Sequence, residues 1–199
     1  MSSTAVVPRR EQLLEAAAQL FSRRGFHAVG IDDIGAAAGI SGPGVYRHFA
    51  SKQALLEALV DRAMTRMLDG AEQITARSDA PDAALEALVD LHVAFAVSER
   101  ALIEVWVRES RSLSDDVRRS LRPRMRAYEQ TWLEVLGPLR QDLEPAGVAV
   151  VAGSTLAMLN GSAFTSHPIP VQEQARLLRA MALAALLAGR TPGRSSPLA

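Results

Sequence analysis

The stretch Ile31–Lys52 constrains the fold more than any other part of the chain, because it has the pattern of two short helices joined by a tight turn. Apolar residues recur four positions apart on each side of the turn, as on the buried face of a helix. The positions expected to be buried are Ile34, Ala38, Ile40, Val45 and Phe49. Gly39 can adopt the left-handed conformation that ends a helix, and Ser41 can cap the next one. This pattern predicts a helix-turn-helix.

The opposite face of the second helix, about two turns long, is expected to be exposed. It carries Gly42, Pro43, Tyr46 and Arg47. An arginine fork matches the O6 and N7 atoms of guanine, and a proline ring can pack on a thymine methyl. Glycines such as Gly44 let the backbone approach DNA closely. We therefore expect this surface to lie in a DNA groove. For Arg47 the alternative is a solvated surface arginine, Tyr46 could also touch bases through its ring, and His48 could instead be a local cap or core support.

Residues 9–57 resemble the DNA-binding domain of TetR-type bacterial transcription regulators. The resemblance is carried by Gly25-Phe26, Asp33-Ile34, Ala38-Gly39-Ile40-Ser41 and Tyr46-x-His48-Phe49-x-Ser51-Lys52-x-x-Leu55-Leu56. It implies phosphate contacts by Tyr46 and His48, whereas Gly30 replaces the usual hydroxyl residue. Lys52 begins a helix, where a phosphate contact would explain an otherwise unfavourable charge. The predicted DNA-binding residues are Gly30, Ser41, Gly42, Pro43, Gly44, Tyr46, Arg47, His48 and Lys52.

Charge and composition narrow the functional classes. The chain of 199 residues has zero net charge, and residues 1–52 hold six basic and four acidic residues, so any DNA affinity is local and two copies are expected on one site. The absence of cysteine excludes disulfides and thiolate metal sites. No metal-ligand spacing, nucleophile elbow or phosphate loop is present, which argues against an enzyme, a metal and a cofactor. No signal peptide is evident, so a cytoplasmic location is expected.

Helical periodicity continues through the chain and predicts an all-α fold. We expect helices at Arg9–Arg24, Ile31–Ala38, from Ser41, Lys52 to about Leu68, Asp82–Val97, Ala101–Arg111, from Ser114 with a kink or split at Pro123, Ala146–Ser166 and Gln172–Ala188. Gly70 is expected to break the chain, and Gly35 to weaken its helix by up to about 1 kcal/mol. The predicted divisions are a flexible arm (1–8), a three-helix helix-turn-helix DNA-binding domain (9–52), a larger helical ligand-binding and dimerisation domain (53–190) and a disordered tail (191–199).

The last two long helices are unusually apolar. Residues 146–166 contain no charge and are long enough for a membrane span, but their many small and polar residues favour a helix packed against protein. The final helix is apolar on two faces and therefore needs two partners. In the resembling family the last two long helices form the dimer interface, which implies a homodimer through about 146–162 and 172–188 and no membrane association.

Aromatic and sulfur-containing residues gather in the central region. The predicted ligand-binding residues are His92, Phe95, Trp106, Met125, Tyr128 and Trp132. They form either plain core or the wall of an adaptable apolar cavity, and His92 is either a hydrogen-bonded core histidine or a ligand contact. The family resemblance favours a cavity for a small, largely apolar effector.

These observations lead to one hypothesis and two alternatives. We expect a homodimeric, ligand-responsive DNA-binding regulator whose two DNA-binding domains enter successive major grooves of a pseudo-palindrome about 34 Å apart. We expect a repressor, and activation is the alternative, since the sequence does not set the direction of regulation. A small effector would shift the protein to a state that binds DNA less well. The alternatives are a protein-interaction adaptor that retains an unused helix-turn-helix, and a small helical enzyme.

Overall fold

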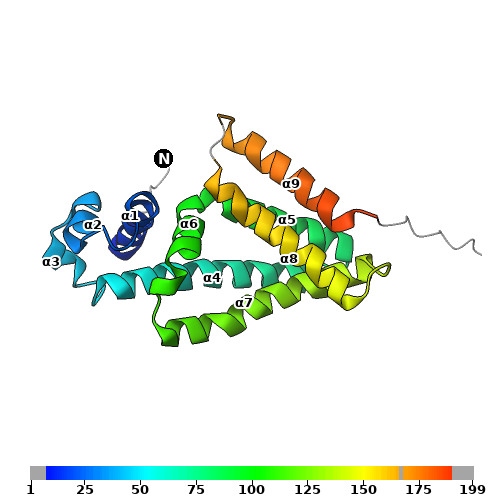
Figure 1. Cartoon of the computed structure of the whole chain (residues 1–199), viewed down its shortest axis with the longest axis horizontal. Coiled ribbons are helices and arrows are strands. Elements are labelled where there is room, and N and C mark those ends of the chain that lie inside the picture. Colours follow the sequence, from blue (N-terminus) through cyan, green and yellow to red (C-terminus); the bar gives the residue numbers. More distant parts are fainter. Residues whose placement is uncertain (1–7, 166–167, 190–199) are drawn as a thin grey trace, which may run out of the picture. The chain divides into compact units, whose positions relative to one another are not determined.

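The structure, a computed structural model, describes residues 8–165 and 168–189, and this part of the chain is helical without a strand (Figure 1). The α-helices are α1 (Arg9–Arg24), α2 (Ile31–Ala37), α3 (Gly42–Val45), α4 (Lys52–Arg77), α5 (Pro81–Ser98), α6 (Arg100–Glu109), α7 (Asp115–Leu136), α8 (Pro145–Gly161) and α9 (Val171–Leu187). Short 3-10 helices are η1 (Ser110–Ser112), η2 (Gly137–Leu139) and η3 (Ser162–Phe164). The predicted all-α class is confirmed. The predicted tail, and the predicted arm apart from Pro8, lie outside the described residues.

The chain divides into two compact units. The first comprises Met1–Arg66 with Glu99–Met125, and the second comprises Met67–Ser98 with Arg126–Ala199. Each unit has its own hydrophobic core, and both α4 and α7 contribute residues to each core. The first unit is larger than the predicted domain 9–52, because the α6 region packs with it. The division into DNA-binding and ligand-binding domains stays a prediction about function.

The helix-turn-helix forms at the predicted positions in the first unit. Gly39 has φ 71°, the left-handed conformation that ends α2. Ser41 then caps α3, since its Oγ accepts a hydrogen bond from the Gly44 N–H at 3.3 Å. Ile34 and Val45 are fully buried and hold the two helices together.

Three local details differ from the prediction. The second helix is one turn long rather than two. Gly42 is buried instead of outward, because the side chain of Asp32 packs against it. A Cβ at position 42 would lie 1.8 Å from Oδ1 of Asp32. Gly35 does not merely weaken α2: a Cβ on it would lie 2.9 Å from the carbonyl oxygen of Ile40 and 3.1 Å from the amide nitrogen of Gly42. The close approach of the turn therefore requires glycine at position 35.

Two predicted breaks do not interrupt their helices. Gly70 lies inside α4, where a Cβ would stand 2.8 Å from Cδ1 of Leu91, so this glycine lets α5 pack closely on α4. Pro123 lies inside α7, which continues to Leu136, so the helix is not split there, and the predicted kink stays a prediction. Packing against Leu91 therefore offsets the cost of Gly70 in a helix.

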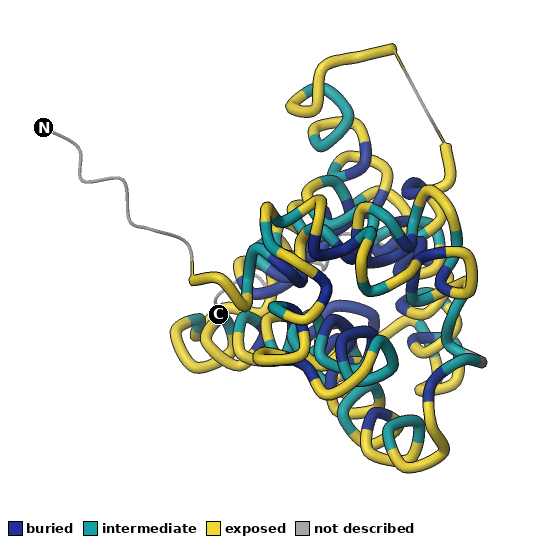
Figure 2. The backbone as a smooth tube through the Cα atoms, turned by 90° about the vertical axis from the view of Figure 1, so that its left-hand side faces the viewer, coloured by how far each residue is buried: buried dark blue, intermediate teal, exposed yellow. Residues whose placement is uncertain are grey.

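The second unit is built around α5, α8 and α9, which pack against one another (Figure 1). Its largest fully buried side chain is Trp132 of α7. Arg140, only 4% exposed, donates to the carbonyl of Leu186 at 2.7 Å and to Asp142 at 2.9 Å, and thereby ties the end of α9 to η2. Buried and exposed residues alternate along the helices, as amphipathic helices require (Figure 2).

Candidate DNA-binding surface and effector-binding residues

The exposed end of the helix-turn-helix carries polar side chains with no internal partner. Tyr46 is 56% exposed, and Arg47 and His48 are exposed beside it. None of these three side chains hydrogen-bonds or ion-pairs with a described residue, so all are available to an external ligand. Ser41 and Pro43 are also exposed, whereas Gly44 is half-buried. Their predicted roles as DNA contacts stay predictions, as does that of the buried Gly42.

Gly30 precedes α2 and helps to anchor its first turn. Its N–H donates to Oδ2 of Asp33 at 2.8 Å, and Arg24 donates to Oδ1 of the same carboxylate at 3.2 Å. These bonds from Gly30 and Arg24 hold the pKa of the Asp33 carboxyl below its ordinary value. The first turn of α2 is thus held by the carboxylate of Asp33, which binds both the Gly30 N–H and Arg24 of α1.

Lys52, predicted to contact phosphate, points into the protein. Its ammonium donates to the carbonyl oxygens of Phe26 and Val29, each at 2.8 Å, and to that of His27 at 3.5 Å. The same nitrogen lies 4.5 Å from the centroid of the Phe26 ring. Its three N–H donors therefore face the loop between α1 and α2, residues 25–30, which we call the Phe26 turn.

A second charged side chain holds the Phe26 turn from α6. The N–H of Phe26 donates to Oε1 of Glu109 at 2.9 Å, and the other oxygen of that carboxylate accepts from Ser112 at 3.1 Å. Both backbone groups of Phe26 are thus bound by opposite charges, Glu109 on α6 and Lys52 on α4. Sequence reasoning missed this arrangement, since the bonded partners are main-chain groups.

The same helix also grips the end of α1. Glu104 accepts hydrogen bonds from the hydroxyl of Ser22 and from Arg100, the latter at 3.0 Å. Burial opposes ionisation of Glu104, but the bonds from Ser22 and Arg100 outweigh it, so the pKa of this carboxyl is lowered. Arg108 donates to the carbonyl of Ser22 at 3.2 Å. We call Glu104, Arg108 and Glu109 the α6 latch.

Four of the predicted ligand-binding residues gather in the second unit. The ring of His92 lies 5.9 Å from that of Tyr128, 6.1 Å from that of Trp132 and 6.4 Å from that of Phe95, between centroids. Its Nδ1 is 3.0 Å from the hydroxyl of Tyr128, and its Nε2 is 3.1 Å from Oδ1 of Asn160. His92 is therefore a hydrogen-bonded core histidine in this structure.

Burial lowers the pKa of His92 to about 4, although the bond to Asn160 opposes this shift. The imidazole is neutral at pH 7, so one ring nitrogen donates and the other accepts. If the Nε2–H of His92 donates to Oδ1 of Asn160 and its Nδ1 accepts from the hydroxyl of Tyr128, both ring nitrogens have a hydrogen-bond partner. The indole N–H of Trp132 is buried beside them without a hydrogen-bond partner of its own.

The other two predicted ligand-binding residues, Trp106 and Met125, line a separate pocket in the first unit. Its volume is about 490 Å³, within the range of small-molecule sites. The remaining lining residues are Ser110, Arg118, Leu121 and Arg122. This pocket therefore combines apolar walls from α6 and α7 with two guanidinium groups.

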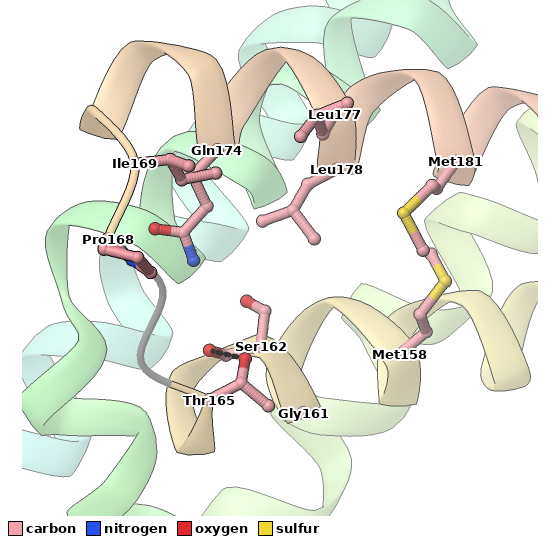
Figure 3. Close-up of a pocket in the computed structure, with 10 residues that line it drawn as sticks. All are labelled: Met158, Gly161, Ser162, Thr165, Pro168, Ile169, Gln174, Leu177, Leu178 and Met181. Atoms are coloured by element: carbon pink, nitrogen blue, oxygen red, sulfur yellow. Dashed lines mark hydrogen bonds between the residues drawn. The ribbon is translucent and has the colours of Figure 1, made fainter.

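A further pocket, of about 430 Å³, lies in the second unit among the end of α8, η3 and α9. Figure 3 shows Met158 and Met181 pointing toward one another across it, with Leu178 projecting into it from α9. Its polar groups are few: Ser162, Thr165 and Gln174 border one end. The pocket is thus largely apolar and is lined mainly by the last two long helices, α8 and α9.

No group of three or more histidine, cysteine or acidic residues with metal-binding geometry occurs among the described residues. The predicted absence of a metal stays a prediction.

Comparisons by sequence identify the family. The model "Bacterial regulatory proteins, tetR family" matches residues 13–59, and the model "Tetracyclin repressor-like, C-terminal domain" matches residues 78–164. The transcriptional repressor KstR2 of Mycolicibacterium smegmatis is 30% identical over 146 residues, which cover 68% of this chain and 70% of that protein. The transcriptional activator FasR of the same species is 45% identical over 65 residues, only 33% of this chain and 30% of that protein.

Solved structures show the same fold. The ketosteroid transcriptional regulator KstR2 of Mycobacterium tuberculosis matches with a TM-score of 0.80 at 24% identity, over 97% of this chain and all of that one. AibR, solved in complex with isovaleryl coenzyme A and operator DNA, matches with a TM-score of 0.72 at 21% identity, over 87% of this chain and 97% of that one. The chain therefore belongs to the TetR family of bacterial transcription regulators, and it is a DNA-binding regulator rather than an enzyme.

Proposed function

We propose that this protein is a ligand-responsive transcriptional repressor that binds a pseudo-palindromic operator as a homodimer. The observation that carries the proposal is the exposed, unpartnered set Tyr46, Arg47 and His48 at the end of the helix-turn-helix. Arg47 reads base edges in the major groove, and Tyr46 and His48 position the head on phosphates. The similar protein KstR2 is named as a repressor, which supports repression as the direction of regulation.

Exposed apolar surface supports a dimer through α8 and α9. Eight large apolar side chains are exposed in the described part of the chain, and six of them lie between residues 150 and 171 or on α9. These six are Val150, Phe164, Ile169, Val171, Leu177 and Met181. On α8 the exposed stripe continues through the small residues Gly153, Ala157 and Gly161, which let a second helix approach closely.

A second copy explains the composition of α8 better than a membrane does. Pro145–Phe164 is long and apolar enough to cross a membrane by length and composition, and 28% of its most apolar window is buried in the protein. Gly153, Ser154 and other small or polar residues on its exposed face suit helix packing rather than lipid. We therefore place the protein in the cytoplasm, where it meets its operator, with α8 and α9 paired against the same helices of a second copy.

The effector is a small molecule with a large apolar part. The apolar walls that Trp106 and Met125 contribute to their pocket support this class. AibR, which shares the fold, was crystallised with isovaleryl coenzyme A, and that supports an acyl ester as the starting point for a search. An effector that binds more tightly to the conformation in which the two DNA-binding domains are wrongly spaced for the operator raises the population of that conformation. Operator binding is weakened as a result.

The test is operator binding by variants of the exposed surface. We expect the purified protein to shift DNA from upstream of its own gene, and Tyr46→Ala and Arg47→Ala each to lose specific binding. Loss of the Arg47 contact to guanine costs about 1–3 kcal/mol of discrimination per subunit. Arg23→Ala, which removes an exposed charge elsewhere on the head, serves as the control.

Size-exclusion chromatography with light scattering checks the dimer in the same samples. Both surface variants should remain dimeric, whereas Leu177→Glu combined with Met181→Glu should give monomers. Unchanged DNA shifts in both Tyr46→Ala and Arg47→Ala would refute the assignment of these exposed residues as the DNA-binding surface. A monomeric wild-type protein would refute the dimer.

A further inference from the structure

The pocket lined by Trp106 and Met125 lies on the opposite side of α6 from Glu104 and Arg108 of the α6 latch. Successive α-helical residues are about 100° apart, so side chains two positions apart point in nearly opposite directions. Trp106 and Ser110 line the pocket. Glu104 and Arg108, each two positions earlier, bind Ser22 of α1 instead. One short helical segment therefore lines the pocket on one side and contacts the end of α1 on the other.

The pocket also has an uncompensated positive charge. Five arginines lie within residues 118–126 of α7. Those at positions 118, 119 and 124 pair with Asp115, Asp116 and Asp61. Arg122 lines the pocket, is exposed, and has no hydrogen bond or ion pair with a described residue. The chemistry that complements this arrangement is an anion attached to an apolar body.

We propose that this pocket binds the anionic group of an amphipathic effector through Arg122, and that the bound molecule weakens DNA binding by disengaging the α6 latch from the Phe26 turn. The apolar part of the effector packs against Trp106, Leu121 and Met125. The inference rests on the proposed function, because it names the ligand chemistry and the coupling of the same regulator.

The coupling follows from the position of Glu109. This residue adjoins Ser110 on the pocket wall, and its carboxylate binds the N–H of Phe26 at 2.9 Å. The Phe26 turn leads directly into α2 of the helix-turn-helix. An occupant that displaces Trp106 and Ser110 therefore moves the one carboxylate that holds this amide. Cores and interfaces switch between discrete packings, so a small displacement there can alter the placement of α2.

Binding is tested with three probes of matched chain length: octanoate, octanoyl coenzyme A and the neutral octanol. Isothermal titration calorimetry gives the affinity, and the change in tryptophan emission that Trp106→Phe abolishes reports occupancy of this pocket. We expect at least one anionic probe to bind about tenfold more tightly than octanol. The tighter anion distinguishes a free carboxylate from a phosphate-bearing thioester as the source of the charge.

Arg122→Ala should weaken binding of that anion about tenfold or more, and the control Arg119→Ala should change it less than twofold. Arg119 lies on the same helix, is exposed and is absent from the pocket lining. Equal effects of the two variants would overturn the proposal. So would binding of octanol as tight as that of the anions, failure of all three probes to bind, or binding by calorimetry without a signal from Trp106.

The coupling is tested by operator binding with and without the saturating anion. In the wild type the anion should lower operator affinity at least about tenfold. Glu109→Ala should bind DNA more weakly without ligand, retain ligand affinity within about threefold, and show less than a twofold further effect of the anion. A full ligand effect in Glu109→Ala would overturn the latch mechanism. Operator binding by the ligand-free wild type checks the proposed function separately, so failure of one can be told from failure of the other.

Discussion

Replacing Lys52 with methionine separates two roles for the only lysine in the chain. Methionine keeps the apolar stem and removes the ammonium, which now donates to the carbonyls of Phe26, His27 and Val29. If the structure describes its main role, the variant loses stability in the head. If Lys52 instead contacts phosphate, as its place in the first turn of a helix predicts, the variant loses an electrostatic contribution to DNA binding.

The structural loss can be estimated from the contacts. Hydrogen bonds from a charged donor contribute about 1.5–3 kcal/mol each, and the cation–π contact with Phe26 about 0.5–1 kcal/mol. One half-buried ammonium shares these partners with solvent, so we expect Lys52→Met to lower the free energy of unfolding by about 2–3 kcal/mol. For a chain of this length that corresponds to a decrease in Tm of about 5–10 °C.

Two measurements decide between the roles. Thermal unfolding by circular dichroism gives Tm, and operator binding from low to high salt gives the slope of log K against log salt. Loss of a phosphate contact reduces that slope by about 0.9 per subunit, whereas loss of an internal clamp weakens binding without changing it. Arg23→Met, which removes an exposed head cation, should leave Tm within about 1 °C. An unchanged Tm with a reduced slope in Lys52→Met would refute the clamp.

Two further predictions concern stability. Gly35→Ala gains helix propensity of about 1 kcal/mol, but its Cβ would press on the backbone of Ile40 and Gly42, so we expect a net loss of about 1–3 kcal/mol in urea unfolding; a more stable variant would contradict the packing argument. His92 has its pKa lowered to about 4, so between pH 6.5 and 4 the unfolded chain binds a proton that the folded chain does not. Stability therefore falls with decreasing pH by about 1.4 kcal/mol per unit in this window. Between pH 7 and 5 the wild type should lose about 2 kcal/mol more than His92→Gln, and equal losses would show that His92 titrates normally.

Most of the helical framework follows from local pattern. The first helix has the predicted bounds Arg9–Arg24, and the last begins and ends one residue before the predicted Gln172–Ala188. Apolar periodicity and terminal glycines are local signals, and they sufficed for these elements. Gly70 was misjudged as a break because the packing that accommodates it comes from a distant residue, Leu91.

The candidate site likewise has a part that could be predicted from the sequence and a part that could not. The outward positions of Tyr46 and Arg47 follow from the spacing of buried neighbours on a short helix. The partners of Lys52 and Glu109 could not be predicted, because both bind backbone groups of the Phe26 turn. Every residue offers the same N–H and C=O groups, so no residue type marks such a partner in the sequence. Only the folded arrangement of α4 and α6 around the turn reveals it.

The single lysine also offers a way to measure how often the amino-terminal region unfolds locally. A protease that cleaves only after lysine has a single scissile bond in this chain, Lys52–Gln53. That bond lies in the first turn of α4, with the side chain occupied by three carbonyls. Cleavage requires this segment to unwind, so the rate of one cut reports how often the amino-terminal region opens.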